Sequence, residues 1–279
     1  MEKIMEKPYV ISEELNIPGV YSEQYIQLNK LDNFRSELDA DLRGMGKNTV
    51  WVPSETLDRG IAKMMNETSL PVVSLDDRYV KTANQYIGIS RGVDSALNDV
   101  GYVPRANYMP VSNQFDRVGQ LGSEVVLVDD VLFSGEMMQW VIDELAKRSV
   151  KVGGVVCGIA MGDGIRRLAE NGVDVQACEV FKDVEDEICE RDFAIVPGSG
   201  RRVDTANANA LYFDTINGRP EQWASIPAEL SEVFYQNSLR RSEVLVQDDV
   251  QMQSIGKFLG FTEKGNARQL IRERMEAQL

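Results

Sequence analysis

Short apolar runs of the kind that form buried strands recur along the chain from residue 49 onward. They are rich in valine and isoleucine and are bounded by polar segments, which is typical of strands covered on both faces. The predicted strands are TVWV (49–52), LPVVSL (70–75), YIGIS (86–90), EVVLV (124–128), VGGVVCGIAM (152–161) and VDVQACEVF (173–181).

Segments with helical spacing separate several of these strands. Met137, Trp140, Val141 and Leu145 fall at intervals that place them on one face of a helix. Strands that alternate with helices predict an α/β fold with a mainly parallel sheet flanked by helices. Helices are expected at 61–67, 135–148 and 165–171, with a polar turn at 53–60 before the first.

The two ends of the chain differ from its middle. Residues 1–48 are polar and mixed, with helical stretches around 22–42. Residues 91–118 carry Gly, Pro and Asn with weak periodicity, so we expect a long excursion with limited structure, of the kind that often covers a site. The expected regions are an N-terminal extension at 1–48, a core at 49–220 and a helical C-terminal region at 221–279.

Composition and charge exclude several classes of function. The 279 residues are 43% apolar and 27% charged, as in globular proteins that bury a core. The formal net charge of −14 argues against a general nucleic-acid surface, so no nucleic acid is expected as a partner. No apolar run approaches the length of a membrane span, and the three cysteines lack metal-ligand spacing, so we expect a cytoplasmic protein without a membrane partner. The lack of histidine excludes a Ser-His-Asp triad, a Cys-His pair and histidine-ligated zinc.

The segment EVVLVDDVLFSGEMMQW, residues 124–140, carries the candidate chemistry. Asp129 and Asp130 stand side by side at the end of a buried strand, where the repulsion between their carboxylates is costly. Ser134 and Gly135 follow in a tight turn before a helix, whose N–H groups and dipole favour a phosphate. Because carboxylates accept hydrogen bonds from vicinal hydroxyls, the pattern fits a sugar phosphate. The alternative is that the aspartates only end a strand and cap a helix, with Ser134 as N-cap.

The segment VVLVDDVLFSGE resembles the motif with which type I phosphoribosyltransferases bind phosphoribosyl pyrophosphate (PRPP). The resemblance implies a Rossmann-like α/β core over roughly 49–214, followed by a helical C-terminal extension. It also implies that Asp129 and Asp130 are the catalytic centre and bind the ribose hydroxyls. The residues that would wrap the 5′-phosphate are Val131, Leu132, Phe133, Ser134 and Gly135.

The motif departs from the family pattern just after the glycine. The family usually has a threonine two positions after it, where this chain has Met137. Glu136 adds a negative charge beside the expected phosphate. Both changes weaken the expected hold on the phosphate, although most of the cradle is backbone.

The resemblance extends to residues that would bind pyrophosphate. In the family an earlier strand ends in a pyrophosphate loop, and VWVPSETLDRGIAK fits that place, with Ser54, Thr56 and Arg59 as candidates. Arg78 and Lys81, after the next strand, are the expected basic residues, and solvated surface charge is the alternative. The segment SRG at 90–92 is a second possible pyrophosphate loop, and Ser54 is also a possible local cap.

The family further implies a hood over the site and an aromatic residue over the base. Phe193 is the expected base-binding residue, with Asp192 reading the edge of the base, and the alternative places Phe193 in the core. The hood candidates are Arg91, Arg105, Tyr108 and Arg117, while Arg201 and Arg202 are candidates for phosphate contacts.

These residues together imply a PRPP-dependent phosphoribosyltransferase that acts on a nucleobase and releases pyrophosphate. Mg²⁺ is the expected cofactor, because it prefers oxygen ligands and bridges phosphates, with Asp129 and Asp130 in indirect contact. The expected partners are PRPP and a nucleobase or nucleotide, with a homodimer or a partner protein bound through the C-terminal helices. One alternative is a regulator of the same fold that senses nucleotides or PRPP. Another is a bacterial antiphage defence effector that acts on nucleotides or NAD.

Overall fold

The chain forms two compact units, each assembled from separate segments. The first unit comprises residues 1–51, 90–102 and 185–279, and the second comprises residues 52–89 and 103–184. Segments from each of the three expected regions contribute to the first unit, so the units do not follow boundaries at 48 and 220. The computed structural model describes residues 7–17, 25–94, 96, 98–105, 107–196, 200–203, 208–210, 219–247 and 267–276.

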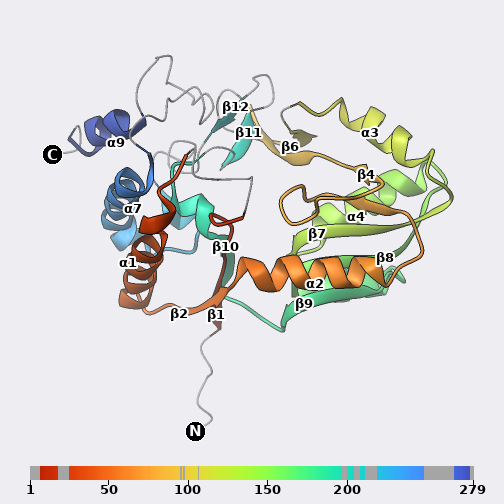
Figure 1. Ribbon diagram of the computed structural model, residues 1–279, viewed down its shortest axis with the longest axis horizontal. Coiled ribbons are helices and arrows are strands. Elements are labelled where there is room, and N and C mark those ends of the chain that lie inside the picture. Colours follow the sequence, from red (N-terminus) through yellow and green to blue (C-terminus); the bar gives the residue numbers. More distant parts are fainter. Residues whose placement is uncertain are drawn as a thin grey trace, which may run out of the picture. The chain divides into compact units, whose positions relative to one another are not determined.

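The second unit is built on a five-stranded parallel sheet (Figure 1). The strand order is β4-β3-β7-β8-β9, and every pair of neighbours is parallel. This arrangement confirms the expected mainly parallel sheet. The strands are β3 (Val72–Ser74), β4 (Gln85–Tyr86), β7 (Glu124–Leu132), β8 (Lys151–Met161) and β9 (Val175–Phe181).

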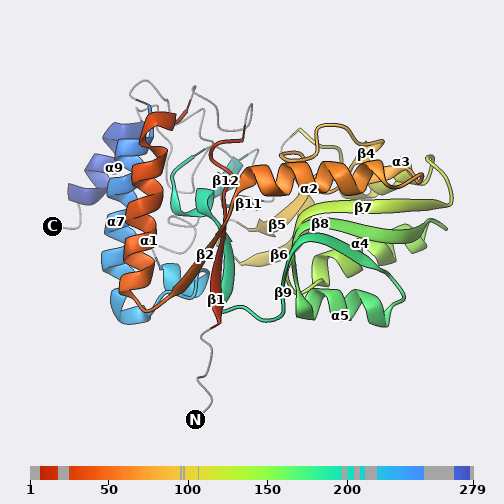
Figure 2. The ribbon, with the colours of Figure 1, turned by 60° about the horizontal axis from the view of Figure 1, so that its bottom comes forward.

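Helices cover both faces of this sheet (Figure 2). Helix α2 (Ser54–Asn66) packs on one face, over β8 and β9, while α4 (Glu136–Ala146) and α5 (Gly162–Glu170) pack on the other. Helix α3 (Val111–Val118) lies against α4 and β4. The larger buried side chains of this core include Phe115, Leu127, Leu132, Met138, Val141, Leu145, Cys157 and Leu168.

Two glycines let α2 lie close to the sheet. A Cβ at Gly158 of β8 would lie 2.7 Å from the carbonyl oxygen of Asp130 and 3.3 Å from Cδ2 of Leu57. A Cβ at Gly60 of α2 would lie 2.3 Å from Sγ of Cys178 on β9. The first turns of α2 and the backbone of Asp130 therefore meet around a position that has no room for a side chain.

Two local expectations are wrong. Residues 54–60 are not a polar turn but the first turns of α2, because Leu57 and Ile61 are one turn apart and both fully buried. Residues 91–118 are not a poorly structured excursion, because they hold the end of β5 (Ile89–Val93), β6 (Asp99–Pro104) and α3.

The first unit contains two small sheets and a group of helices. The sheet β10-β1-β2 pairs β1 (Pro8–Ser12) in parallel with β10 (Asp186–Cys189), and its third strand is β2 (Asn48–Val52). The second sheet has the order β12-β11-β5-β6 and includes β11 (Arg201–Val203) and β12 (Ala208–Ala210). The longer helices are α1 (Leu31–Gly44), α7 (Ser231–Leu245) and α9 (Ala267–Glu276), and the short 3₁₀ turns are η1 (Leu28–Lys30), η2 (Glu190–Phe193), η3 (Pro220–Gln222) and η4 (Ala228–Leu230). None of the described helices is long and apolar enough to cross a membrane.

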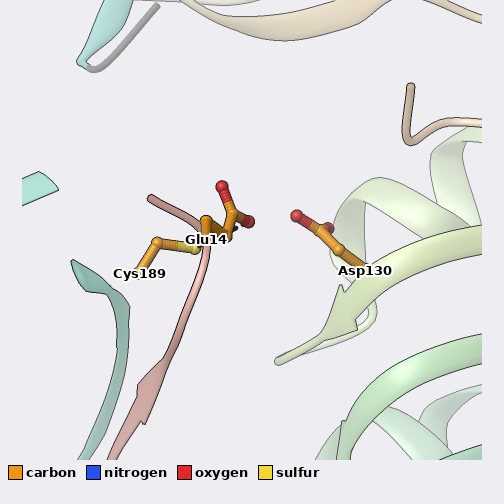
Figure 3. A group of neighbouring side chains, drawn as sticks. All are labelled: Glu14, Asp130 and Cys189. Atoms are coloured by element: carbon orange, nitrogen blue, oxygen red, sulfur yellow. Dashed lines mark hydrogen bonds between the residues drawn. The ribbon is translucent and has the colours of Figure 1, made fainter. Parts of the chain in front are cut away.

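Buried carboxylates tie the N-terminal segment of the first unit to β10 and η2. Glu190 has no exposed surface, and its Oε1 accepts the backbone N–H groups of Glu14 and Leu15, each at 2.8 Å. The guanidinium of Arg35 donates to the same carboxylate at 2.7 Å. Glu14 and Cys189 lie side by side, with Sγ of Cys189 donating to Oε1 of Glu14 at 3.4 Å (Figure 3). Burial and then the Glu14 carboxylate raise the pKa of Cys189, which keeps it a thiol.

We predict that Gly158→Ala destabilises the protein by about 1–3 kcal/mol, because the new methyl group overlaps the Asp130 carbonyl oxygen. Gly44→Ala, at the end of α1, is the matched control, since a Cβ there meets nothing within 4 Å. The control should be neutral or more stable by up to about 1 kcal/mol. Chemical denaturation measures both changes, and equal stabilities of the two variants would contradict the close approach of α2 to β8.

Candidate functional site

The order of the strands locates the candidate site of the second unit. Counted along the chain, the strands lie in the order 2-1-3-4-5, so the chain continues from β3 to β4 on one side and resumes with β7 on the other. Ligands of open parallel sheets bind outside the carboxyl ends of the strands at such a reversal of order. Asp76 follows β3, and Asp129 and Asp130 lie near the end of β7. The acidic pair therefore stands where the topology favours a ligand.

Asp129 is a buried carboxyl group with incomplete hydrogen bonding. It is 2% exposed, and its Oδ1 accepts the backbone N–H of Asp130 at 3.0 Å. Its Oδ2 is buried and has no hydrogen-bond partner among the described residues. Asp130 is half-buried, its Oδ1 accepts the N–H of Val131 at 2.8 Å, and its carboxyl group projects from the strand (Figure 3).

Burial is the main reason why the pKa of Asp129 lies well above its usual range. The charges of Asp130 and Asp76 raise that pKa further, and the charge of Arg105 opposes the shift. Without a ligand the pair is therefore stabilised by a proton on Asp129. A ligand that brings hydroxyl donors or positive charge would favour the ionised form instead.

The turn after β7 exposes several backbone donors at the start of α4. Val131 and Leu132 still belong to β7, paired with Ile159 and Ala160, so only residues 133–135 of the expected phosphate loop form the turn. Within the part of the chain that the structure describes, the N–H groups of Phe133, Ser134 and Gly135 donate to no other group. They are free to bind an anion at the positive end of α4.

Gly135 gives the turn its shape. Its φ of 74° is left-handed, and it is the N-cap residue of α4. A Cβ there would lie 3.2 Å from both Cα and the carbonyl oxygen of Gly164 in α5. The hydroxyl of Ser134 accepts the N–H of Glu136 at 3.4 Å, but the N-cap of α4 is Gly135 and not Ser134, and the N–H of Ser134 stays available.

Arg167 of α5, which the sequence did not single out, supports this turn. Its Nε donates to the carbonyl oxygen of Ser134 at 2.8 Å, and its Nη2 lies 3.5 Å from the carboxylate of Glu136. Glu136 is therefore paired with a cation. Met137 is partly buried against the core and offers no hydroxyl to the turn. Helical spacing alone could not reveal Arg167, because α4 and α5 meet only in the folded unit.

Asp76 was also missed, and it orders the loop after β3. Its Oδ1 accepts the N–H of Arg78 at 2.9 Å, and its Oδ2 accepts those of Tyr79 and Val80 at 2.7 and 3.1 Å. An aspartate that accepts backbone N–H groups two and more residues ahead is a common turn former, and this signal was present in SLDD. The loop carries Arg78, which is half-buried, and Lys81, which is exposed.

Two of the hood candidates interact with aspartates of the second unit, Arg105 with Asp129 and Tyr108 with Asp77. Arg105 donates from Nε to the carbonyl oxygen of Ile89 at 3.0 Å, and its charge acts on Asp129. The Tyr108 hydroxyl donates to Asp77 at 3.2 Å, and burial together with the Asp77 charge raises the pKa of Tyr108 to about 12. The other two candidates are exposed, Arg117 on α3 and Arg91 on β5 of the first unit.

The expected pyrophosphate-binding residues of α2 differ in their exposure to solvent. Ser54 is buried at the first position of α2, and Thr56 is half-buried in the same turn. Arg59 is exposed and pairs with Glu55 of its own helix at 3.6 Å. The second possible loop at 90–92 is a strand, because it lies within β5 and Gly92 pairs with Arg202.

Phe193 lies in the core of the first unit. It has no exposed surface, and its ring is 5.5 Å from that of Trp223 and 5.4 Å from that of Phe234. Its ring therefore has no free face for a base, and we do not retain it as a base-binding residue. The neighbouring candidates also have protein partners: Asp192 lies 3.6 Å from Arg191, Arg201 pairs with Asp99 at 2.9 Å, and Arg202 is 9% exposed.

Comparisons with known proteins give structural similarity only. No protein-family model matches the chain, and no curated protein matches it. Among solved structures, a Leishmania donovani UMP synthase matches at 15% identity and a TM-score of 0.30 over 45% of this chain and 26% of its own length. An orotate phosphoribosyltransferase of Mycobacterium tuberculosis matches at 12% identity and a TM-score of 0.28, over 44% of this chain and 68% of its own length. A purine phosphoribosyltransferase of Pyrococcus horikoshii matches at 16% identity and a TM-score of 0.30, over 50% of this chain and 91% of its own length.

The chain thus spans about a quarter of the length of the UMP synthase. Each of these similarities covers at most 50% of this chain. The strands and helices of this chain form the α/β fold expected from the sequence.

We predict that Asp129→Asn raises the free energy of unfolding at pH 7 by about 1–3 kcal/mol, because the amide removes a buried charge that the carboxylates of Asp130 and Asp76 repel. The pKa of Asp129 is higher in the folded than in the unfolded protein. The native protein therefore loses stability as the pH rises from the pKa of the unfolded state to that of the folded state. The gain should therefore shrink as pH falls to about 4, where Asp129 approaches protonation in both states.

Chemical denaturation at the two pH values measures this gain. Asp58→Asn, at an exposed position of α2, is the control and should change stability by less than about 0.5 kcal/mol. A less stable Asp129→Asn protein at pH 7 would show that the carboxylate of Asp129 stabilises the fold.

Proposed function

We propose that the second unit binds PRPP and that the protein is a phosphoribosyltransferase that transfers the phosphoribosyl group to a nucleobase. One observation carries the proposal: a buried carboxyl group and a half-buried one stand side by side, shortly before a turn with three unused N–H groups at a helix start. A pentose 5-phosphate presents hydroxyls and a phosphate at neighbouring positions, which these two features complement.

Each part of the sugar phosphate has a matching group. The free Oδ2 of Asp129 and the projecting carboxyl group of Asp130 would accept hydrogen bonds from the two ribose hydroxyls. The N–H groups of residues 133–135 would donate to the 5′-phosphate, and the dipole of α4 would favour its charge. Arg78, Lys81 and Arg105 would supply positive charge for the pyrophosphate.

The same carboxyl groups fit a magnesium ion. Asp129 offers an oxygen without a partner, and the half-buried Asp130 offers a second carboxylate that can reach a metal directly or through water. When bound, Mg²⁺ would supply positive charge to the pyrophosphate and the ribose hydroxyls.

The reaction would replace pyrophosphate by the base at C1 of the ribose. The bond between C1 and the pyrophosphate oxygen breaks, and its electron pair leaves with pyrophosphate. A ring nitrogen of the base donates a lone pair to form the new bond to C1, and its proton passes to solvent. C1 has oxocarbenium character between these events, as in glycoside cleavage. The chain's residues contribute positioning and charge stabilisation, so the lack of histidine is no obstacle.

A PRPP-sensing or nucleotide-sensing regulator is the second candidate function. Met137 stands where the motif usually has threonine and is packed against the core, and Glu136 adds an acidic group that Arg167 must neutralise. Both features lower the affinity expected for the phosphate and fit a protein that binds without turnover. Pyrophosphate release with PRPP, Mg²⁺ and a panel of nucleobases separates the two functions, because a sensor binds PRPP and releases none.

We predict that Asp129→Asn with Asp130→Asn weakens PRPP binding at least about 100-fold, because each lost charge-assisted hydrogen bond is worth about 1.5–3 kcal/mol. Calorimetry with PRPP and Mg²⁺ measures the affinity, and thermal unfolding verifies that the variant folds. Asp58→Asn with Asp116→Asn, at exposed positions of α2 and α3, makes the same charge change and should bind normally. Unchanged affinity in a folded acidic-pair variant would refute the proposed site.

We also predict that PRPP with Mg²⁺ lowers the pKa of Asp129, because hydroxyl donors and positive charge favour the carboxylate that burial disfavours. Affinity should therefore rise with pH until the pKa of the free protein is passed. Carbon-13 NMR of labelled aspartate follows the titration, and the Asp129→Asn spectrum assigns the resonance. A pKa that rises or stays constant on binding would mean that the ligand does not contact this carboxyl group.

A further inference from the structure

A second site lies in the first unit, in a small cavity between α1 and α7. The cavity has a volume of about 90 Å³, and both helices contribute to its walls. Its polar lining consists of Lys30, Asn33, Glu37, Arg240 and Arg241, and Phe34, Val244 and Leu245 complete it. Three of these residues are basic and one is acidic.

This excess of positive charge stands out in an acidic chain. The sequence holds 44 acidic against 30 basic residues, so most cations have carboxylates available to them. Within the described residues, Lys30 forms no ion pair, and Arg240 donates only to the amide oxygen of Asn237, at 3.1 Å. The one acid in the lining, Glu37, accepts a hydrogen bond from Asn33 at 2.8 Å, and its charge acts on Arg241. Two cations of the cavity therefore lack a carboxylate partner.

Arg241 forms the buried base of the cavity. Its side chain is 1% exposed, and it is held by Asp41, by the hydroxyl of Ser238 at 2.9 Å and by the ring of Phe234, whose centroid is 5.5 Å away. Its Nε has no hydrogen-bond partner among the described residues. Burial is the main cause that lowers the pKa of Arg241, and the carboxylates of Asp41 and Glu37 oppose this shift. A nearby anion would offset that cost.

The size of the cavity limits what it can hold. A volume of about 90 Å³ is several times the roughly 10–15 Å³ that one water molecule needs on the same measure. A tetrahedral oxyanion fits that space, whereas a nucleoside needs far more. Guanidinium and ammonium groups that converge from two elements are the usual partners of phosphate oxygens.

We propose that the cavity between α1 and α7 binds a phosphate group, either as free phosphate or at the end of a small phosphate ester. Lys30 and Arg240 would contact its oxygens, and Arg241 would stabilise its charge from below. The anion would bridge η1 and α1 to α7 and so fasten the helices of the first unit. The proposal is independent of PRPP binding, because it uses none of the residues of the second unit.

Hydrogen exchange of the full chain tests the proposal with inorganic phosphate as probe, at ionic strength held constant with chloride. Phosphate should slow amide exchange in residues 28–44 and 231–245 in a saturable way. In the variant Lys30→Gln with Arg240→Gln, the phosphate concentration that gives half-maximal protection should rise at least about tenfold, because two charge-assisted contacts are lost. Both residues are exposed, so the variant is expected to fold.

Lys63→Gln with Arg166→Gln, at exposed positions of the second unit, removes the same charge and should keep the protection. Protection at residues 130–140 reports phosphate at the α4 turn and is scored separately. Stronger protection by ribose 5-phosphate than by phosphate would identify an ester as the ligand, and the reverse would identify free phosphate. Absence of protection in α1 and α7, protection that survives in the Lys30 and Arg240 variant, or equal loss in the control variant would overturn the proposal.

Discussion

Two neighbouring carboxyl groups at the buried end of β7 cannot both stay ionised unless something supplies them with donors or positive charge. Asp129 has one oxygen with no partner among the described residues and a second that is used only by the next N–H group. A strand end that served the fold alone would gain stability from an asparagine or a single acid. The protein keeps a locally unfavourable arrangement, and this cost makes a ligand at the carboxyl end of the sheet the natural explanation.

The surrounding structure is arranged so that this strand end cannot shift. Glycines bring α2 against the Asp130 backbone and α5 against the turn of residues 133–135, where side chains would force them apart. The loop after β3 is fixed separately, by three backbone N–H groups that converge on Asp76. The groups proposed to bind the sugar phosphate are therefore set in place when the protein folds, and binding need not order them.

Much of this fold could be predicted from the sequence, because buried parallel strands leave near-continuous apolar runs. The acidic pair and the turn from Phe133 to Gly135 are also local in the chain, so their place at the end of a strand and the start of a helix could be predicted as well. The start of α2 was misjudged because polar residues of an exposed helical face resemble those of a turn, and only Leu57 and Ile61 reveal the buried face. Arg167 reaches the turn after β7 only through folding, so no spacing marked it. Arg105 was among the hood candidates, and the turn-forming Asp76 was visible in SLDD. Phe193 shows the opposite difficulty, because an aromatic residue suits a core as well as a base, and here it fills the core.

Arg167 joins two helices through a single guanidinium, which donates to the Ser134 carbonyl oxygen and faces the Glu136 carboxylate. The charge of an acidic residue in the first turn of α4 is thus offset, beside the turn, by a basic residue that projects from α5. Evolutionary change at either position would be constrained by the other, although they lie far apart in the chain. Among divergent relatives, an acid at the first position should accompany a base at the second, and a threonine or serine after the glycine should free both to vary.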